Sequence, residues 1–72
     1  MKTLRALRRA IDAAGSQAAL ADRIGVAQQT ISVWVRRSKR VPAEHVQRVA
    51  RATGVPPEAL RPDLYPRAGR GA

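Results

Sequence analysis

The sequence predicts an all-α fold, a compact domain of four to five short helices. Apolar residues recur three and four residues apart in successive segments, as they do on one face of an amphipathic helix. Glycines and prolines stand at the ends of these segments, where helices stop or begin. No segment alternates apolar and polar residues for long enough to form a strand. The chain has 72 residues, which is enough for one domain with a thin core.

The first two helices have an apolar face and characteristic residues at their boundaries. Thr3 is expected to cap the first helix, and Gly15 is expected to end it. The face expected to turn inward on this helix consists of Leu4, Leu7, Ile11 and Ala14. Ser16 is expected to cap a second, shorter helix, which ends at Gly25. The expected inward residues of that helix are Leu20, Ala21 and Ile24.

A third and a fourth helix follow, with a basic run between them. The third helix is expected at about residues 27–37, and its expected buried residues are Ile31, Trp34 and Val35. Trp34 lies on the apolar stripe, which favours a position in the core over a stacking platform. Pro42 suits the first turn of the fourth helix, and Gly54 closes that helix. The inward residues expected on it are Val46, Val49 and Ala50.

The C-terminal part of the chain has room for one more short helix. Pro56 and Pro57 allow about one helical turn before Pro62 interrupts the chain again. Residues 67–72 are rich in glycine and arginine. We therefore expect a domain of residues 1–66 followed by a disordered basic tail.

The turn at Gly25 is the most informative part of the sequence. Only two or three residues separate the second helix from the third, so the two must cross steeply instead of forming an antiparallel hairpin. Such a turn needs a positive φ, which glycine adopts without a Cβ clash. Ala21 is small enough to let the two helix backbones approach closely, while Val26 and Ile31 can fill the angle between them. Residues 17–37 are therefore predicted to form a helix-turn-helix.

The composition favours anionic partners and argues against several kinds of site. Fourteen lysines and arginines against five acids leave a net charge of +9, which attracts polyanions. The chain has no cysteine, and neither a metal nor a cofactor is expected. It has no nucleophile motif and no glycine-rich phosphate loop, so an enzyme is not expected. The single His45 is expected on the surface, and the five acids are expected to form ion pairs with neighbouring arginines on helices.

The stretch "QAALADRIGVAQQTISVWV" resembles the helix-turn-helix of the lambda-repressor-like superfamily, which includes phage Cro and repressor proteins. The matching positions are Gln17, Ala21, Gly25, Val26, Ile31 and Trp34. Two later stretches, "RVPAEHVQRVARATGV" and "LRPDLYP", resemble the last helices of small Cro-like regulators of the YdaS type, found in prophages and toxin–antitoxin-like loci. Ala27 departs from the pattern, which has a capping Ser or Thr there. The resemblance implies a sequence-specific DNA-binding regulator, a repressor or autoregulator of the Cro type.

In this motif the second helix of the pair enters the major groove with its N-terminal residues against the bases. Glutamine matches adenine N6 and N7, and valine can contact a thymine methyl group. The residues expected to contact bases are Gln28, Gln29, Ser32, Val33 and Arg36. Those expected to contact phosphates are Gln17, Thr30, Arg37, Lys39 and Arg40. Ser32 and Arg36 can also reach the DNA backbone, Thr30 can simply satisfy the helix backbone, and the role of Gln17 is implied by the resemblance alone.

A single short helix reads few base pairs. The resemblance therefore implies a homodimer on double-stranded DNA, with half-sites about 34 Å apart. Leu4 or Leu7, or the segment after Gly54, are the candidates for the dimer surface. No apolar run is long enough for a membrane span or a secretory signal, so a cytoplasmic, nucleoid-associated protein is expected.

Two other functions stay open at the level of the sequence. The domain can instead bind a toxin or another protein, as an antitoxin or adaptor, with Leu64 and Tyr65 as anchors. Packing of that segment against the fourth helix is the favoured alternative. The third function is non-specific binding to nucleic acid or to an anionic membrane. Against membrane binding, the cations do not lie opposite a broad apolar stripe on one long helix.

Overall fold

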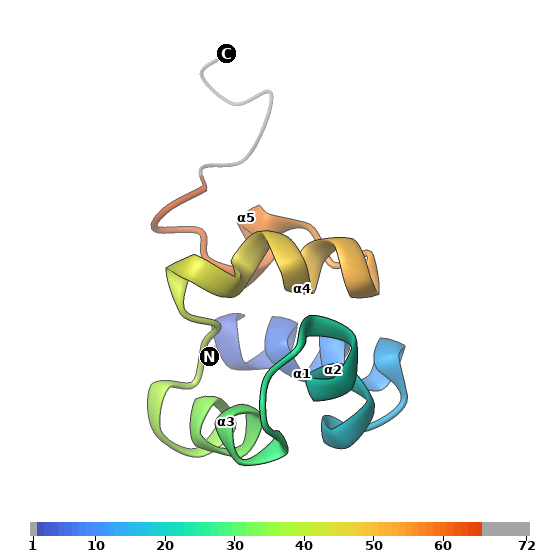
Figure 1. The fold of residues 1–72 in the computed structure, drawn as a ribbon. Coiled ribbons are helices and arrows are strands. Elements are labelled where there is room, and N and C mark those ends of the chain that lie inside the picture. Colours follow the sequence, from blue (N-terminus) through green and yellow to red (C-terminus); the bar gives the residue numbers. More distant parts are fainter. Residues whose placement is uncertain (1, 66–72) are drawn as a thin grey trace.

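The computed structural model describes residues 2–65, which form helices and short connections with no strand among them. In chain order the helices are α1 (Lys2–Ala14), α2 (Gln17–Ile24), α3 (Gln28–Val33), α4 (Val46–Thr53) and α5 (Pro57–Leu60). A π-helical turn, Trp34–Ser38, continues α3, and a 3₁₀ turn, Ala43–His45, leads into α4. The predicted all-α fold is confirmed (Figure 1). The tail predicted at residues 67–72 lies outside the described residues.

The helices share one core around α1, which packs against α2, α4 and α5. Figure 1 shows α4 and α5 above α1 and α3 below it, with α2 in front. The largest side chains without solvent contact are Leu7, Leu20, Ile31, Val41, Val46, Val49 and Leu60. Burial of one such side chain stabilises the fold by about 1.5–3 kcal/mol relative to leaving it exposed. Because these residues come from all five helices and one loop, every element depends on the same core.

The buried face of α1 differs in part from the prediction. Its buried residues are Ala6, Leu7, Ala10 and Ala14. Leu4 and Ile11 were expected there, but both are only half-buried and lie at the edges of the buried stripe. Alanines at Ala6 and Ala10 have no atoms beyond Cβ, so neighbouring helices can pack directly over this part of α1. The α2 prediction is confirmed, because Leu20, Ala21 and Ile24 are all buried.

Local sequence signals predicted most of the helix boundaries. The Ser16 Oγ accepts a hydrogen bond from the Ala19 N–H at 3.0 Å, which confirms the cap of α2. Gly15 and Gly54 follow α1 and α4 with φ of 115° and 80°, so both predicted helix ends are confirmed. The predicted cap at Thr3 is wrong. Thr3 lies inside α1, because no glycine or proline precedes it to delay the start of the helix.

The start of α4 also differs from the prediction. Pro42 was expected in the first turn of the helix, but its ψ of 148° keeps it extended just before the 3₁₀ turn. Regular α-helix begins only at Val46, three residues after the turn begins. The expected inward face is nevertheless present, because Val46 and Val49 are fully buried and Ala50 is half-buried.

Candidate nucleic-acid interface

The turn between α2 and α3 has the geometry that the sequence predicted. Gly25 ends α2 in the left-handed conformation, with φ of 75° and ψ of 35°. The N–H groups of Gly25 and Val26 both donate to the carbonyl of Ala21, the latter at 3.0 Å. Ala27 is extended and makes no side-chain cap, and α3 begins at the next residue. Together α2 and α3 form a helix-turn-helix.

The inner side of α3 is anchored in the core. Ile31 is fully buried and Trp34 is 4% exposed, so the expected core position of Trp34 is confirmed. The Trp34 ring lies 5.3 Å from the ring of His45, at an interplanar angle of 37°. The surface position predicted for His45 is wrong, because the 3₁₀ turn brings it against Trp34 and leaves its side chain only 18% exposed. The outer side of α3 is therefore held in a fixed orientation.

The start of α3 presents two unburied amides to solvent. Gln28 and Gln29 are both exposed, and Val33, one turn further on, is 41% exposed. Arg36 is exposed on the following turn. The predicted base-reading residues therefore lie on the outer surface of the helix, with the exception of Ser32.

Ser32 has an intramolecular partner that the sequence does not reveal. Its Oγ donates to the Oε1 of Gln17 at 2.7 Å, and both side chains are half-buried. The bond joins the first residue of α2 to the last turn of α3. It occupies the Ser32 proton and one acceptor of Gln17, and it leaves the Gln17 amide N–H groups available as donors. Two residues 15 positions apart carry no local signal of this contact, which only the crossing of the two helices creates.

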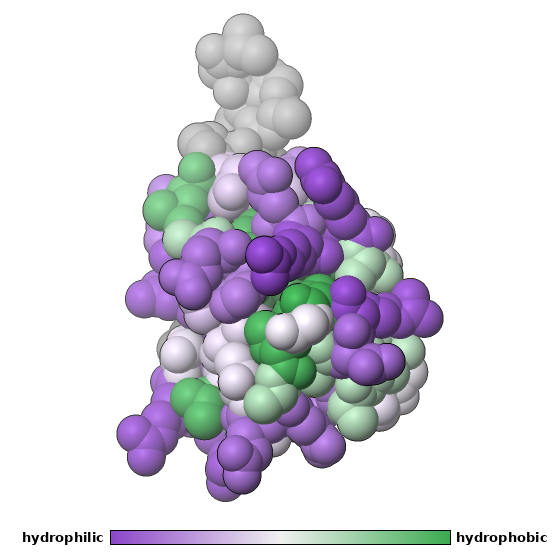
Figure 2. All heavy atoms as spheres, viewed as in Figure 1, coloured by the Kyte–Doolittle hydropathy of each residue, from purple (hydrophilic) through white to green (hydrophobic). Residues whose placement is uncertain are grey.

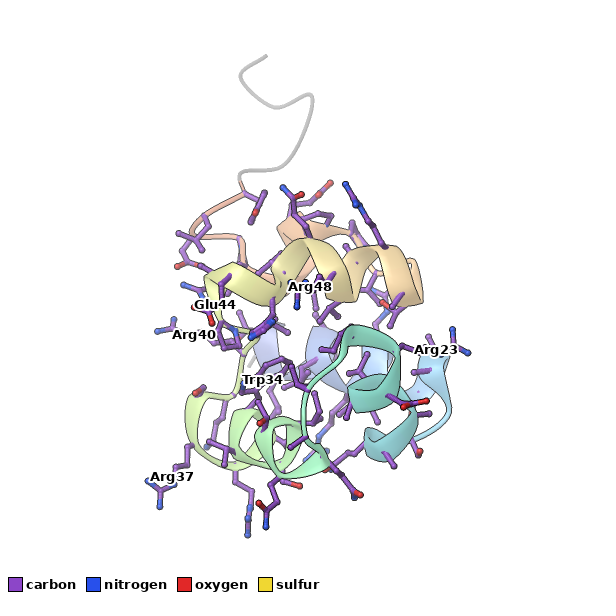
Figure 3. All side chains as sticks on the ribbon, viewed as in Figure 1. Arg23, Trp34, Arg37, Arg40, Glu44 and Arg48 are labelled. Carbon is purple, nitrogen blue, oxygen red and sulfur yellow. The ribbon has the colours of Figure 1, made fainter. Side chains whose placement is uncertain are left out.

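A group of exposed cations follows α3. Arg36, Arg37, Lys39 and Arg40 are all exposed, whereas Thr30 is half-buried. Figure 3 shows Arg37 and Arg40 extending away from the helices. Among the side chains that the structure describes, the ion pairs are Arg61–Asp63 and His45–Glu44, so none of these four cations has a carboxylate within 4.0 Å. Their charges are available to an external anion.

The chain between α3 and α4 is shaped by irregular backbone. Residues Trp34–Ser38 are π-helical, and the N–H of Lys39 donates to the carbonyl of Trp34 to close the segment. Lys39 itself has a φ of 57°, the left-handed conformation that non-glycine residues adopt at a cost of about 1–2 kcal/mol. π-Helical turns occur often at functional sites. This one carries Arg36 and Arg37 and leads directly into Lys39 and Arg40.

Arg61, beyond α5, fastens the same loop from the other side. Its Nη1 donates to the carbonyl of Val41 at 3.0 Å, and its Nε and Nη2 donate to the two carboxylate oxygens of Asp63 at 2.9 and 2.7 Å. These hydrogen bonds from Arg61 are the main reason why the pKa of Asp63 falls from 3.8 to about 2, and Arg40 lowers it further through its charge. No local pattern in the sequence indicates this contact, because 20 residues separate Arg61 from Val41.

Several surface predictions need correction. Ion pairs between helix acids and arginines were expected. Within the described side chains of residues 3–65, however, Asp12, Asp22 and Glu58 form none. These acids are solvated instead, which costs little because exposed ion pairs contribute about 0–1 kcal/mol. Leu7 is fully buried and cannot form a dimer surface. Leu64 is 45% exposed instead of packing inward.

Tyr65, next to Leu64, does pack against the core. The C-terminal segment therefore contacts the core through Tyr65, whereas Leu64 is left outside, and packing against the fourth helix in particular stays a prediction. No helix within residues 2–65 is long and apolar enough to cross a membrane.

These elements define a small helical protein with a helix-turn-helix whose second helix is exposed on its outer side. A family model described as bacterial toxin YdaS matches residues 7–68, and the chain belongs to the YdaS family. The "Gene 30 protein" of Enterobacteria phage phi80 is 35% identical over 60 residues, which cover 82% of each chain. No solved structure gives a significant match. The predicted resemblance to the YdaS type is thus confirmed, together with a relationship to phage proteins.

Proposed function

We propose that this protein binds double-stranded DNA sequence-specifically, with the outer side of α3 in the major groove, and regulates transcription as a repressor or autoregulator. The observation that carries this proposal is the exposed start of α3. Gln28 and Gln29 are exposed there, on a helix whose opposite side is fixed in the core by Ile31 and Trp34. A helix held in this way keeps its outer side chains in one register against the bases. The role needs no catalytic step and no cofactor.

Three side chains of α3 supply the base contacts in this proposal. Each glutamine amide can donate to N7 and accept from N6 of an adenine, which distinguishes adenine from the other bases. The exposed methyl groups of Val33 suit a thymine methyl group. Arg36 lies three residues after Val33, and in this proposal it contacts a guanine or the DNA backbone.

Ser32 acts indirectly in this proposal. Because its hydroxyl proton is used by Gln17, it holds the Gln17 amide in place between α2 and α3. The free N–H groups of Gln17 then donate to a phosphate next to the groove that α3 enters. Phosphate contacts of this kind fix the orientation of the protein on the duplex.

The cations after α3 supply the remaining phosphate contacts. Arg37, Lys39 and Arg40 are exposed and have no carboxylate partner among the described residues. Thr30, at the side of α3, contributes a further hydroxyl to the backbone. Each neutralised phosphate steepens the dependence of log affinity on log salt by about 0.9. This part of the interface supports affinity for any duplex, whereas the glutamines supply the preference among sequences.

A six-residue α3 spans few base pairs, so the proposal includes a homodimer on a two-fold symmetric site. Its half-sites would be about 34 Å apart, one turn of the duplex. Selection of bound sequences from a random duplex pool tests both points. A palindromic consensus is expected, and sedimentation of the complex should show two protein chains per duplex.

Substitutions separate the two kinds of contact. Gln28→Ala and Gln29→Ala should each lose about 1–3 kcal/mol of affinity for the selected duplex, at one base pair, with little change on a scrambled duplex. Arg37→Ala should weaken binding to both duplexes equally and reduce the salt slope by about one. Equal losses on the two duplexes for the glutamine variants would contradict base reading by α3.

A further inference from the structure

A second charged surface lies away from α3, in an open cleft of about 540 Å³ between the end of α2 and α4. Its rim carries three arginines from two helices, Arg23 on α2 and Arg48 and Arg51 on α4. Figure 3 shows Arg48 and Arg23 on either side of this region, in the upper half of the molecule.

The arginines of the cleft are short of anionic partners. Arg48 and Arg51 are exposed and have no carboxylate within 4.0 Å among the described side chains. Arg23 reaches across the cleft, and its Nη1 donates to the carbonyl of Ala52 at 3.4 Å. That contact holds the guanidinium near the end of α4. Asp22 is the one carboxylate in the lining, so the cleft has an excess of positive charge.

The floor of the cleft is apolar. Ile24 and Ala52 line it together with the backbone of Gly25. Figure 2 shows apolar surface lying between hydrophilic groups where α2 faces α4. A site built only for phosphates needs no such floor, because phosphate oxygens make polar contacts. The combination indicates a ligand that carries both anionic groups and an apolar side chain.

The cleft is spatially separate from the proposed DNA interface. It is formed by the end of α2, Gly25 and α4, whereas Arg37 extends from the lower end of the molecule and Arg40 from its left side, away from Arg23 (Figure 3). A duplex held by the outer side of α3 therefore leaves the cleft open to a different molecule. The inference does not depend on DNA binding.

We propose that this cleft binds an acidic segment of a partner protein, with carboxylates on either side of an apolar residue. The carboxylates pair with Arg48 and Arg51, since guanidinium groups bind carboxylates through two parallel hydrogen bonds. The apolar residue lies against half-buried Ala52 and the small part of Ile24 that is exposed, which is 5% of its surface. A second copy of this chain is a poor occupant of the cleft, because no two of its five acids lie closer than five residues apart in the sequence.

The test uses a fluorescent pentapeptide in which a leucine is flanked by two glutamates on each side. Its affinity for the full-length protein is measured by polarisation, and backbone amide shifts map the site. The double variant Arg48→Ala with Arg51→Ala is compared with Arg8→Ala with Arg9→Ala, which removes two exposed cations from α1. The cleft variant should bind the peptide about tenfold more weakly, as expected for lost charged hydrogen bonds, and the control less than twofold.

Three outcomes would overturn the proposal. Equal losses in the two double variants would mean that net charge alone attracts the peptide. Undiminished binding of a peptide with glutamines in place of the glutamates would exclude carboxylate recognition. Larger shifts of the cleft amides with a DNA duplex or with phosphatidylserine vesicles than with the peptide would assign the arginines to phosphate groups. All four substitutions are at exposed residues, so the variants are expected to fold, which circular dichroism checks.

Discussion

The helix α3 is bounded by two turns that reach the same left-handed backbone conformation by different means. The turn before α3 uses Gly25, with φ of 75°, and is closed by the carbonyl of Ala21, four residues earlier. The turn after it uses Lys39, with φ of 57°, at the end of a π-helical segment. The first turn is unstrained and locally closed. The second is strained, and a distant arginine, Arg61, holds the loop beyond it.

The difference between the turns agrees with two different roles: the first turn orients α3, and the second presents a cation beside it. The glycine turn has only to orient the helix, so the residue without a side chain is the best choice there. The second turn keeps a lysine where a glycine would be easier for the backbone, and it presents that lysine among exposed arginines. Strain retained in this way is found at functional sites. The comparison thus supports Lys39 as part of the proposed interface.

The largest expected effect is at the first turn. Gly25→Val should lower the free energy of unfolding by about 2 kcal/mol, because a β-branched residue is disfavoured at positive φ. A Cβ at this position has no atom within 4 Å, so the loss comes from the backbone conformation and not from a clash. Thermal denaturation should show a melting temperature lower by roughly 8–16 °C. Gly25→Asn, which tolerates this conformation better, is the matched control and should lose less.

A smaller effect is expected at the contact that holds the second turn. Arg61→Met keeps the length of the side chain but leaves the Val41 carbonyl and Asp63 without their donor. The free energy of unfolding in urea should fall by about 1.5 kcal/mol. Arg5→Met, at an exposed position of α1, should change it by less than about 0.5 kcal/mol. Equal behaviour of the two variants would show that Arg61 does not stabilise the loop.

The turn at Gly25 and the contact of Arg61 with Val41 also show which features of the fold a sequence can predict. The signals at Ser16, Gly25 and Gly54 are local, because a cap or a left-handed turn depends on residues within four positions. The apolar periodicity predicted the core of α2 and the inner side of α3 for the same reason. Such rules covered most of the fold and the exposed start of α3.

The parts that escaped prediction are made by contacts between distant segments. The hydrogen bond from Ser32 to Gln17 and the contact from Arg61 to Val41 exist only once the helices have crossed. The π-helical turn contains no glycine or proline that would indicate it in the sequence. The cleft between α2 and α4 combines residues from two helices that are far apart in the chain. Periodicity within one segment contains no information on any of these.

The strain at the second turn can be relieved. Lys39→Gly should raise the free energy of unfolding by about 0.5 kcal/mol, since the gain at positive φ exceeds the greater entropy of glycine in the unfolded chain. Lys39→Ala keeps the strain and should not stabilise the protein. Both variants should lower the salt slope of DNA binding by about one, because each removes the same charge. A Gly variant no more stable than the Ala variant would show that Lys39 is unstrained.

The smallest effect concerns acid stability. The pKa of Asp63 is about 2 in the folded protein, against 3.8 for a free side chain, mainly because of the hydrogen bonds from Arg61. The carboxylate therefore favours the folded state above a pH of about 4, and this contribution is lost as the pH falls from 4 to 2. It is small, because the Asp63 side chain is 50% exposed and solvent screens its charge.

Asp63→Asn should remove this contribution without disturbing the rest of the loop. The variant should melt slightly below the unmodified protein at pH 7, and the difference should shrink steadily between pH 4 and pH 2 as Asp63 becomes protonated. Melting curves at pH 7, 4, 3 and 2 measure it. Asp12→Asn, at an exposed residue of α1 without an ion pair among the described side chains, should show no such convergence. A difference of the same size at pH 7 and at pH 2 would show that Asp63 acts through its shape and not through its charge.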